Sequence, residues 1–156
     1  MELSQPNGIQ FIEGFEGLRL VAYKDQHGIW TIGWGSIMYQ SGVAVKEGDT
    51  ITPDQAEVLL LWEIGIKTVA VNSYIQTVSL NQNQFDSLIS FAYNCGCAAL
   101  HGSTLLRLIL AVPDNPYITN AFQKWDKVNE DGELVKSNGL WTRRTAEAKL
   151  YFTPIP

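Results

Sequence analysis

The chain has 156 residues and a mass of 17.4 kDa, with 46% hydrophobic and 17% charged residues. This length suits one soluble domain with a sizeable core and leaves no room for a second full domain. The formal net charge of −5 argues against nonspecific nucleic-acid binding and against adhesion to anionic membranes, because both need a basic surface. No apolar stretch approaches the ~20 residues of a membrane-spanning helix. The N-terminus lacks the regions of a signal peptide, so we expect a cytoplasmic protein without a membrane anchor.

Cysteine and histidine are too few and too scattered to predict a metal site. Cys95 and Cys97 are two residues apart, a spacing that fits neither a disulfide nor a zinc motif. His27 and His101 have no cluster of ligating residues around them. We expect two free thiols and no metal.

The first 51 residues predict a short helix and then a small antiparallel sheet. Asn7, with Gln10 three residues later, is typical of a helix start. The helical spacing of apolar residues ends at Glu16 and Gly17. Short apolar runs punctuated by glycines follow, from residue 18 to residue 50, and predict strands joined by tight turns.

The rest of the chain predicts helices. Thr52 with Gln55, and Asn81 with Gln84, form two cap patterns, the first opening a long helix and the second a central one. Further helices are expected at 103–112, 116–125 and 140–152, with a turn at Glu130-Asp131-Gly132. The predicted class is α+β and mainly helical, with a β-containing N-terminal lobe (1–51), a connecting helix (52–75) and a helical C-terminal lobe (76–156). A ligand would bind between such lobes.

Three residues of the N-terminal lobe could carry chemistry together. Glu16 ends the first helix, Asp25 stands in a predicted turn nine residues later, and Thr31 follows in the next strand. Cleavage of an acetal by water needs one acid to protonate the leaving oxygen and one base to activate or orient the water. The spacing alone is also compatible with solvated surface charges.

The wider sequence resembles a known family. Residues 15–25 and 28–35, which contain these three residues, resemble the phage-type lysozymes of glycoside hydrolase family 24, the endolysins of tailed phages. The similarity continues in order through residues 80–96 and 103–106 to a C-terminal helix with Arg143, Arg144 and Glu147. The resemblance implies a lysozyme-like fold. It also implies hydrolysis, without a cofactor, of the β-1,4 bond between N-acetylmuramic acid and N-acetylglucosamine in bacterial peptidoglycan, which lyses the host cell.

The resemblance also implies roles for individual residues. By position, Glu16 is the general acid, Asp25 holds the attacking water or stabilises the oxocarbenium-like centre, and Thr31 helps to position that water. An arginine of the last helix is expected to pair with Glu16; Arg144 fits that place best, and Arg143 is the alternative. The family is generally regarded as inverting.

Candidate contacts to the glycan are hydroxyl and apolar side chains at matching positions. They are Ile37, Tyr93, Ser103 and Thr104. For Tyr93, burial in the core is an equally good interpretation. Four tryptophans are more typical of the core than of a sugar platform: Trp30, Trp34, Trp62 and Trp125.

One position departs from the family pattern. The family commonly has histidine where this chain has Ser36. Because serine carries no charge, a structural ion pair is in doubt at this position, whereas the acid and water-positioning roles are not affected.

Two other functions compete with this hypothesis. A lytic transglycosylase cleaves the same bond without water, but Asp25 and Thr31 favour the hydrolase because a transglycosylase needs no positioned water. An inactive wall-binding module is the second alternative, and the retained carboxylates argue against it. The resemblance further implies a monomer that waits in the host cytoplasm until a holin opens the membrane, and then acts on the wall from the periplasm.

Overall fold

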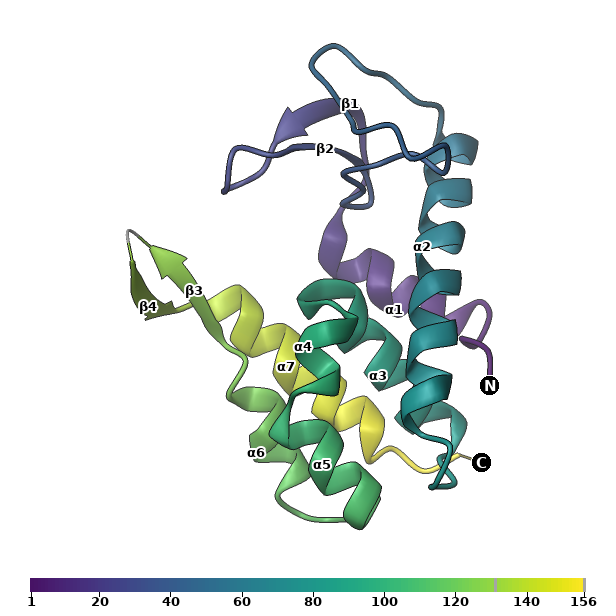
Figure 1. The fold of residues 1–156 in the computed structure, drawn as a ribbon, viewed down its shortest axis with the longest axis vertical. Coiled ribbons are helices and arrows are strands. Elements are labelled where there is room, and N and C mark those ends of the chain that lie inside the picture. Colours follow the sequence, from purple (N-terminus) through teal and green to yellow (C-terminus); the bar gives the residue numbers. More distant parts are fainter. Residues whose placement is uncertain (131, 156) are drawn as a thin grey trace. The chain divides into compact units, whose positions relative to one another are not determined.

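The computed structural model describes residues 1–130 and 132–155. Within them, helices make up most of the regular structure, with two short β-hairpins (Figure 1). The elements in chain order are α1 (Asn7–Glu16), β1 (Arg19–Lys24), β2 (Trp30–Gly33), α2 (Pro53–Tyr74), α3 (Gln82–Cys95), α4 (Cys97–His101), α5 (Thr104–Ala111), α6 (Ile118–Gln123), β3 (Lys127–Glu130), β4 (Glu133–Lys136) and α7 (Asn138–Tyr151). The predicted α+β, mainly helical class is confirmed.

The chain forms two compact units. We call Ile9–Ile66 the hairpin unit, and Met1–Gly8 together with Lys67–Pro156 the helical unit. The long helix α2 runs through the boundary between them. The three-part division expected from the sequence, with boundaries at residues 51 and 75, stays a prediction.

The hairpin unit is built on an antiparallel pair of strands, β1 and β2. Tyr23 pairs with Thr31, and Lys24 pairs with Trp30. Because side chains alternate across a sheet, the two pairs project from opposite faces. The face of Trp30 packs on a small core whose buried members are Ile32, Val45 and Leu59. The opposite face carries Tyr23 and Thr31.

Helix caps in the structure match the sequence patterns. The Thr52 hydroxyl accepts from the Gln55 backbone N–H at 3.2 Å, and the Gln55 side chain accepts from the Thr52 N–H at 2.8 Å. Asn81 and Gln84 make the same reciprocal pair at 2.9 Å in each direction. These caps satisfy backbone donors that a helix start leaves unpaired, so the starts of α2 and α3 are fixed locally.

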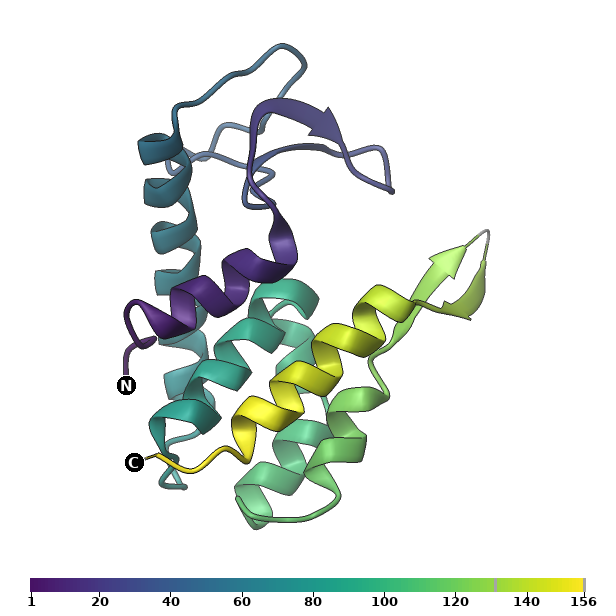
Figure 2. The same ribbon diagram turned by 180° about the vertical axis from the view of Figure 1, so that it is seen from behind.

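The helical unit is organised around α3, which is buried along most of its length. Helix α7 packs against α3 on one side and against α6 on the other (Figure 2). Phe91 of α3 and Phe122 of α6 meet edge to face, with 5.9 Å between ring centroids, and Phe122 also contacts Tyr151 of α7 at 5.9 Å. Aromatic contacts thus join the three helices into one core.

Two elements of the helical unit were not expected from the sequence. These are the short helix α4 and the hairpin of β3 and β4. The hairpin includes the predicted turn at Glu130-Asp131-Gly132, although Asp131 lies outside the described residues. Within residues 1–130 and 132–155, no helix has both the length and the apolar character needed to cross a membrane.

Candidate functional site

Asp25 is fixed by the turn between β1 and β2. Its Oδ1 accepts hydrogen bonds from the backbone N–H groups of His27 and Ile29, each at 2.8 Å. Its own N–H donates to the Ile29 carbonyl at 2.9 Å, and Gly28 closes the turn by donating to the Asp25 carbonyl at 3.0 Å. Because these bonds use only one carboxylate oxygen, the turn orients Asp25 while Oδ2 can still accept hydrogen bonds from a ligand.

Thr31 is oriented by the same stretch of backbone. Its Oγ1 lies 3.0 Å from the Ile29 carbonyl oxygen. A carbonyl can only accept, so the Thr31 hydroxyl must donate this bond. The lone pairs of Oγ1 are therefore its only remaining hydrogen-bonding capacity. Thr31 can only accept a hydrogen bond from a bound water or ligand.

Glu16 is the last residue of α1 and is partly buried. Gly35, in the turn after β2, lies close to the Glu16 carboxylate, since a Cβ built on Gly35 would be 3.5 Å from Glu16 Oε2. The backbone of Gly35 has φ +105°, a conformation that glycine adopts far more readily than other residues. The turn thus approaches the carboxylate without adding a side chain.

Both predicted carboxylates influence the pKa of one side chain, Tyr23. Burial is the first cause that raises the pKa of the Tyr23 phenol; Arg19 lowers it, and the negative charges of Glu16 and Asp25 raise it further. Both carboxylates therefore lie within electrostatic range of Tyr23, which is paired with Thr31. Within the hairpin unit, Tyr23 is thus linked to all three predicted residues, to Glu16 and Asp25 by electrostatics and to Thr31 by strand pairing.

The turn after β2 also holds the position that departs from the family pattern. Ser36 is completely buried, and within the described part of the chain its hydroxyl has no hydrogen-bond partner. Its backbone N–H and carbonyl are both bonded to Ile32, at 2.9 and 2.8 Å. Ile37, the next residue and a predicted glycan contact, is 47% exposed.

Ser103 and Thr104 lie at a pocket of about 470 Å³ in the helical unit. Ser103 caps α5 by accepting from the Leu106 N–H at 3.0 Å and donating to the Leu100 carbonyl at 2.7 Å, so its hydroxyl is used within the fold. Thr104 is exposed and accepts from Arg107 at 3.0 Å. Thr104 is therefore the better placed of the two to meet a ligand.

Aromatic and polar side chains in α6 and immediately before and after it line the same pocket. Tyr117 is 71% exposed, and Trp125 contributes to the lining while its ring meets Phe91 edge to face at 5.3 Å. Asn120 and Lys124 add an amide and a cation. Trp125 therefore combines the expected core contact with a partly exposed position in the lining of the pocket.

Tyr93 is a further predicted glycan contact in the helical unit. It is partly buried on α3, and the Lys67 ammonium lies 5.8 Å from the centroid of its ring. Both interpretations made from the sequence, core packing and ligand contact, remain compatible with this position.

Arg143 and Arg144 belong to a buried charge cluster. Glu147 Oε1 accepts from Arg143 Nε at 3.2 Å and from Arg144 Nη2 at 2.9 Å, as well as from the Ser90 hydroxyl at 2.8 Å. Burial is the largest influence on the Glu147 pKa and raises it, whereas both arginines oppose the increase. Two arginines thus share one buried carboxylate oxygen.

Arg144 is bound on several sides within the helical unit. Besides Glu147, its guanidinium donates to Cys95 Sγ at 2.8 Å and to Asn94 Oδ1 at 3.1 Å. It is completely buried, with its guanidinium 4.8 Å from the centroid of the Phe91 ring. Cys95 and Cys97 are free thiols, as expected, and burial raises the pKa of the Cys95 thiol.

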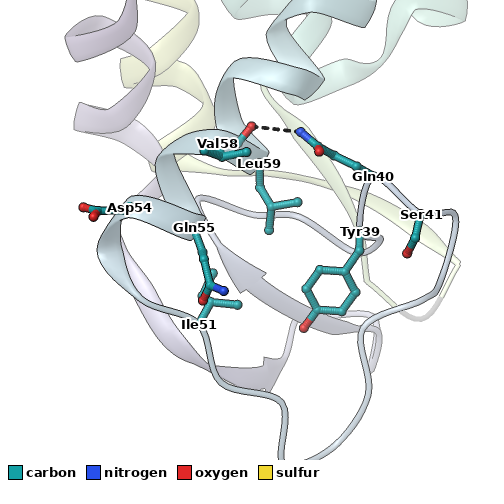
Figure 3. A pocket seen from close by; sticks show the side chains of 8 residues that line it. All are labelled: Tyr39, Gln40, Ser41, Ile51, Asp54, Gln55, Val58 and Leu59. Atoms are coloured by element: carbon teal, nitrogen blue, oxygen red, sulfur yellow. Dashed lines mark hydrogen bonds between the residues drawn. The ribbon is translucent and has the colours of Figure 1, made fainter.

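A separate pocket of about 360 Å³ lies in the hairpin unit (Figure 3). Its apolar lining consists of Ile51, Val58, Leu59 and the ring of Tyr39. Three of these residues, Tyr39, Ile51 and Leu59, also belong to the core of the unit. The pocket therefore adjoins the core face of the sheet, and none of the three predicted catalytic residues lines it.

Comparison with known proteins identifies the family. The model of the Phage lysozyme family matches residues 13–147. The chain belongs to the phage lysozyme family. The endolysin of Acyrthosiphon pisum secondary endosymbiont phage 1 is 38% identical over 97% of this chain and 98% of its own length.

Solved structures agree with this family. The endolysin of Escherichia coli O157:H7 phage FAHEc1 is 43% identical, with a TM-score of 0.90 over 97% of this chain and 94% of its own. The muramidase domain of SpmX from Asticaccaulis excentricus is 32% identical, with a TM-score of 0.84 over 98% and 99% of the two chains. As a phage lysozyme, the chain is a glycoside hydrolase, and bacterial peptidoglycan is its substrate.

Sequence reasoning missed four residues near the predicted site residues of this phage lysozyme. Tyr23 lies within electrostatic range of Glu16 and Asp25, Gly35 lies close to Glu16, and Tyr117 and Lys124 line the pocket at Thr104. The position of Tyr23 at the end of β1, two residues before Asp25, was a usable signal, because it is close in sequence to a predicted catalytic residue. The two pocket residues had no such signal, since they depend on how α6 packs.

Proposed function

We propose that this phage lysozyme is an inverting muramidase that cleaves the β-1,4 bond between N-acetylmuramic acid and N-acetylglucosamine and so lyses the host. Glu16 is the acid that protonates the leaving oxygen. Asp25 and Thr31 hold the water that attacks the anomeric carbon from the other side of the sugar ring. This assignment follows the two-carboxylate scheme of inverting glycosidases.

The arrangement around Ile29 carries the proposal. It leaves Asp25 Oδ2 and Thr31 Oγ1 as acceptors on neighbouring parts of one hairpin. A water that donates one hydrogen to each acceptor directs its lone pairs away from the protein, toward a bound sugar. A second acceptor beside the carboxylate favours water, rather than Asp25 itself, as the nucleophile. For this reason we favour inversion over retention.

The position of the acid next to Gly35 also supports the proposal. The glycosidic oxygen must approach Glu16 closely to receive its proton. The absence of a side chain at Gly35, on the Oε2 side of the carboxylate, leaves room for that approach.

For the electrostatic partner of the acid, we propose an arginine of α7. Arg144 best fits the place that the family resemblance implies, and Arg143 is the alternative. A cation beside Glu16 favours loss of its proton. Replacement of the partner, tested with Arg144→Gln and Arg143→Gln side by side, should therefore move the alkaline limb of the pH–activity profile to higher pH. An unchanged profile in both variants would exclude this pairing.

We propose that Thr104 and the aromatic side chains around it bind the glycan, with Ile37 and Tyr93 as further contacts and Ser103 holding the start of α5. The exposed ring of Tyr117 offers an apolar face to a sugar, and the Thr104 hydroxyl offers a hydrogen bond. Tyr117→Ala should raise KM for peptidoglycan while leaving kcat nearly unchanged, because such a contact contributes to ground-state binding.

The function is tested with Glu16→Gln and with the products of digestion. Purified Glu16→Gln should fail to lyse cells whose outer membrane has been permeabilised. Mass spectrometry of wall digested by the wild type should find reducing, hydrated muropeptides. Anhydro-muropeptides would instead identify a lytic transglycosylase, and full activity of Glu16→Gln would disprove the assignment of the acid.

From the family we also propose that access to the wall depends on a phage holin. Expressed alone in the cytoplasm of a host cell, the enzyme should accumulate without lysis, and co-expression with a holin should release it to the periplasm and the wall. Prompt lysis without a holin would contradict this route.

A further inference from the structure

Tyr23 shares one face of the hairpin with the groups assigned to the attacking water. It lies directly opposite Thr31 in the register of β1 and β2, and residues paired in this way project from the same face. Asp25 follows directly after β1, at the start of the turn that leads to β2, and its backbone N–H donates to the Ile29 carbonyl. The position of Tyr23 is therefore part of the face on which hydrolysis is proposed to occur.

The ring of Tyr23 is held in place and its hydroxyl keeps its proton. The Arg19 guanidinium lies 4.7 Å from the ring centroid, a cation–π contact that orients the ring. The pKa of the phenol is raised, first by burial and then by the charges of Glu16 and Asp25, against a lowering by Arg19. At neutral pH, Tyr23 is an uncharged hydrogen-bond donor within electrostatic range of the Glu16 and Asp25 carboxyl groups.

The hydroxyl of Tyr23 differs from those of two other tyrosines whose pKa is raised. The Tyr39 hydroxyl donates to Asp49 Oδ2 at 3.0 Å, and the Tyr151 hydroxyl donates to the Pro113 carbonyl at 2.9 Å. For Tyr23, the described residues of the chain provide no hydrogen-bond partner for the hydroxyl. A partly buried donor without a protein partner, beside reactive carboxylates, is suited to bind a ligand.

We propose that the Tyr23 hydroxyl binds the substrate at the point of cleavage, by donating a hydrogen bond to a hydroxyl or acetamido oxygen of the saccharide. This inference rests on the function proposed above and adds a substrate-binding residue to it. The attacking water is a poorer partner, because its lone pairs are needed for the new bond to the anomeric carbon. The saccharide oxygens are acceptors that complement a neutral phenol.

The matched variants Tyr23→Phe and Tyr39→Phe test the proposal. Tyr23→Phe keeps the ring and its contact with Arg19 and removes only the hydroxyl. We expect kcat/KM for peptidoglycan to fall about tenfold, as for the loss of one hydrogen bond, with an unchanged melting temperature. Tyr39→Phe removes a bond within the fold, so it should lower the melting temperature and leave kcat and KM unchanged.

Saccharide binding provides a second readout that does not depend on turnover. A peptidoglycan tetrasaccharide should bind the Glu16→Gln enzyme more tightly than the Glu16→Gln, Tyr23→Phe double variant by calorimetry. If Tyr23→Phe matches the wild type in kcat, KM and binding, or loses activity only because less protein is folded, the inference about Tyr23 is overturned. An active Glu16→Gln enzyme would overturn the proposed acid instead, so the two failures are distinguishable.

Discussion

Asp25 and Thr31 are both held by the backbone of one residue, Ile29. The Ile29 N–H donates to Asp25 Oδ1 at 2.8 Å, and the Ile29 carbonyl accepts from Thr31 Oγ1 at 3.0 Å. These bonds set the orientation of a carboxylate and a hydroxyl relative to each other through a rigid β-turn. The same contacts determine which substitutions should lower activity without lowering the stability of the fold.

Two replacements of Asp25 should distinguish the effect of its negative charge on activity from the effect of its hydrogen bonds on stability. Asp25→Asn keeps an acceptor for the His27 and Ile29 amides but loses the negative charge, so activity should fall by about 10²-fold or more with little change in stability. Asp25→Ala should show the same decrease in activity and should also lose about 1 kcal/mol of stability. Activity assays and urea unfolding of the two variants check this. A nearly active Asp25→Asn enzyme would restrict Asp25 to a structural role.

Thr31 should act through its oxygen, and not through its shape. Thr31→Val removes the acceptor for the water and the bond to Ile29, so we expect a loss of activity of about 10²-fold and of stability by about 1 kcal/mol. Thr31→Ser retains the hydroxyl and is the matched control. It should recover most of the activity. Equal activities of the valine and serine variants would be inconsistent with a water-positioning role.

Gly35 should be required for activity, whereas Gly42 should be required only for stability. Both have positive φ, +105° and +81°, so alanine at either position should cost about 1–3 kcal/mol of stability. Only at Gly35 would the added methyl group lie 3.5 Å from Glu16 Oε2; at Gly42 it would meet open space. Assays at a temperature where both variants are folded should find Gly35→Ala impaired and Gly42→Ala active. Equal activity would show that Glu16 does not need this opening.

Ionisation of the Tyr151 phenol should make the protein less stable at alkaline pH. Burial is the main cause that raises its pKa in the folded state above the ordinary value of 10.0, and the proton is used in the bond to Pro113. A raised folded-state pKa contributes stability that is complete below pH 10 and is lost as the pH rises toward the folded value, by about 1.4 kcal/mol per pH unit. Tyr151→Phe lacks this contribution.

Guanidinium unfolding of the two proteins between pH 8 and 11 measures the effect. Tyr151→Phe should be less stable by about 1 kcal/mol at pH 8, because it lacks the hydrogen bond, and the difference should narrow above pH 10. Tyr23 and Tyr39 are present in both proteins and cancel in the comparison. A constant difference across this range would contradict the assignment.

The helices were predictable where the signal is local. The caps at Thr52 and Asn81 use side chains three residues apart, so their hydrogen bonds are readable in the sequence and are present in the structure. The β3–β4 hairpin was missed because its strands are mostly exposed and lack the alternation of buried and polar residues on which strand prediction relies.

The candidate site was predictable to a similar extent. Asp25 and Thr31 are positioned by backbone within six residues of each other, and the resemblance to lysozymes pointed to them. The role of Tyr23 depends on the register of two strands, and the pocket at Thr104 depends on how α5 and α6 pack. The partners of Arg144 on α3 could not be predicted from the sequence, because they are about 50 residues away along the chain.

The most direct test of the proposed mechanism is the configuration of the first product. Proton NMR, recorded while a soluble peptidoglycan oligosaccharide is cleaved and before the anomers equilibrate, distinguishes the two configurations at the new reducing end. Attack by a water held on Asp25 and Thr31 predicts that the α-anomer forms first from the β-1,4 bond. Initial formation of the β-anomer would show retention, and with it a covalent intermediate or a different nucleophile, and would contradict the roles assigned to Asp25 and Thr31.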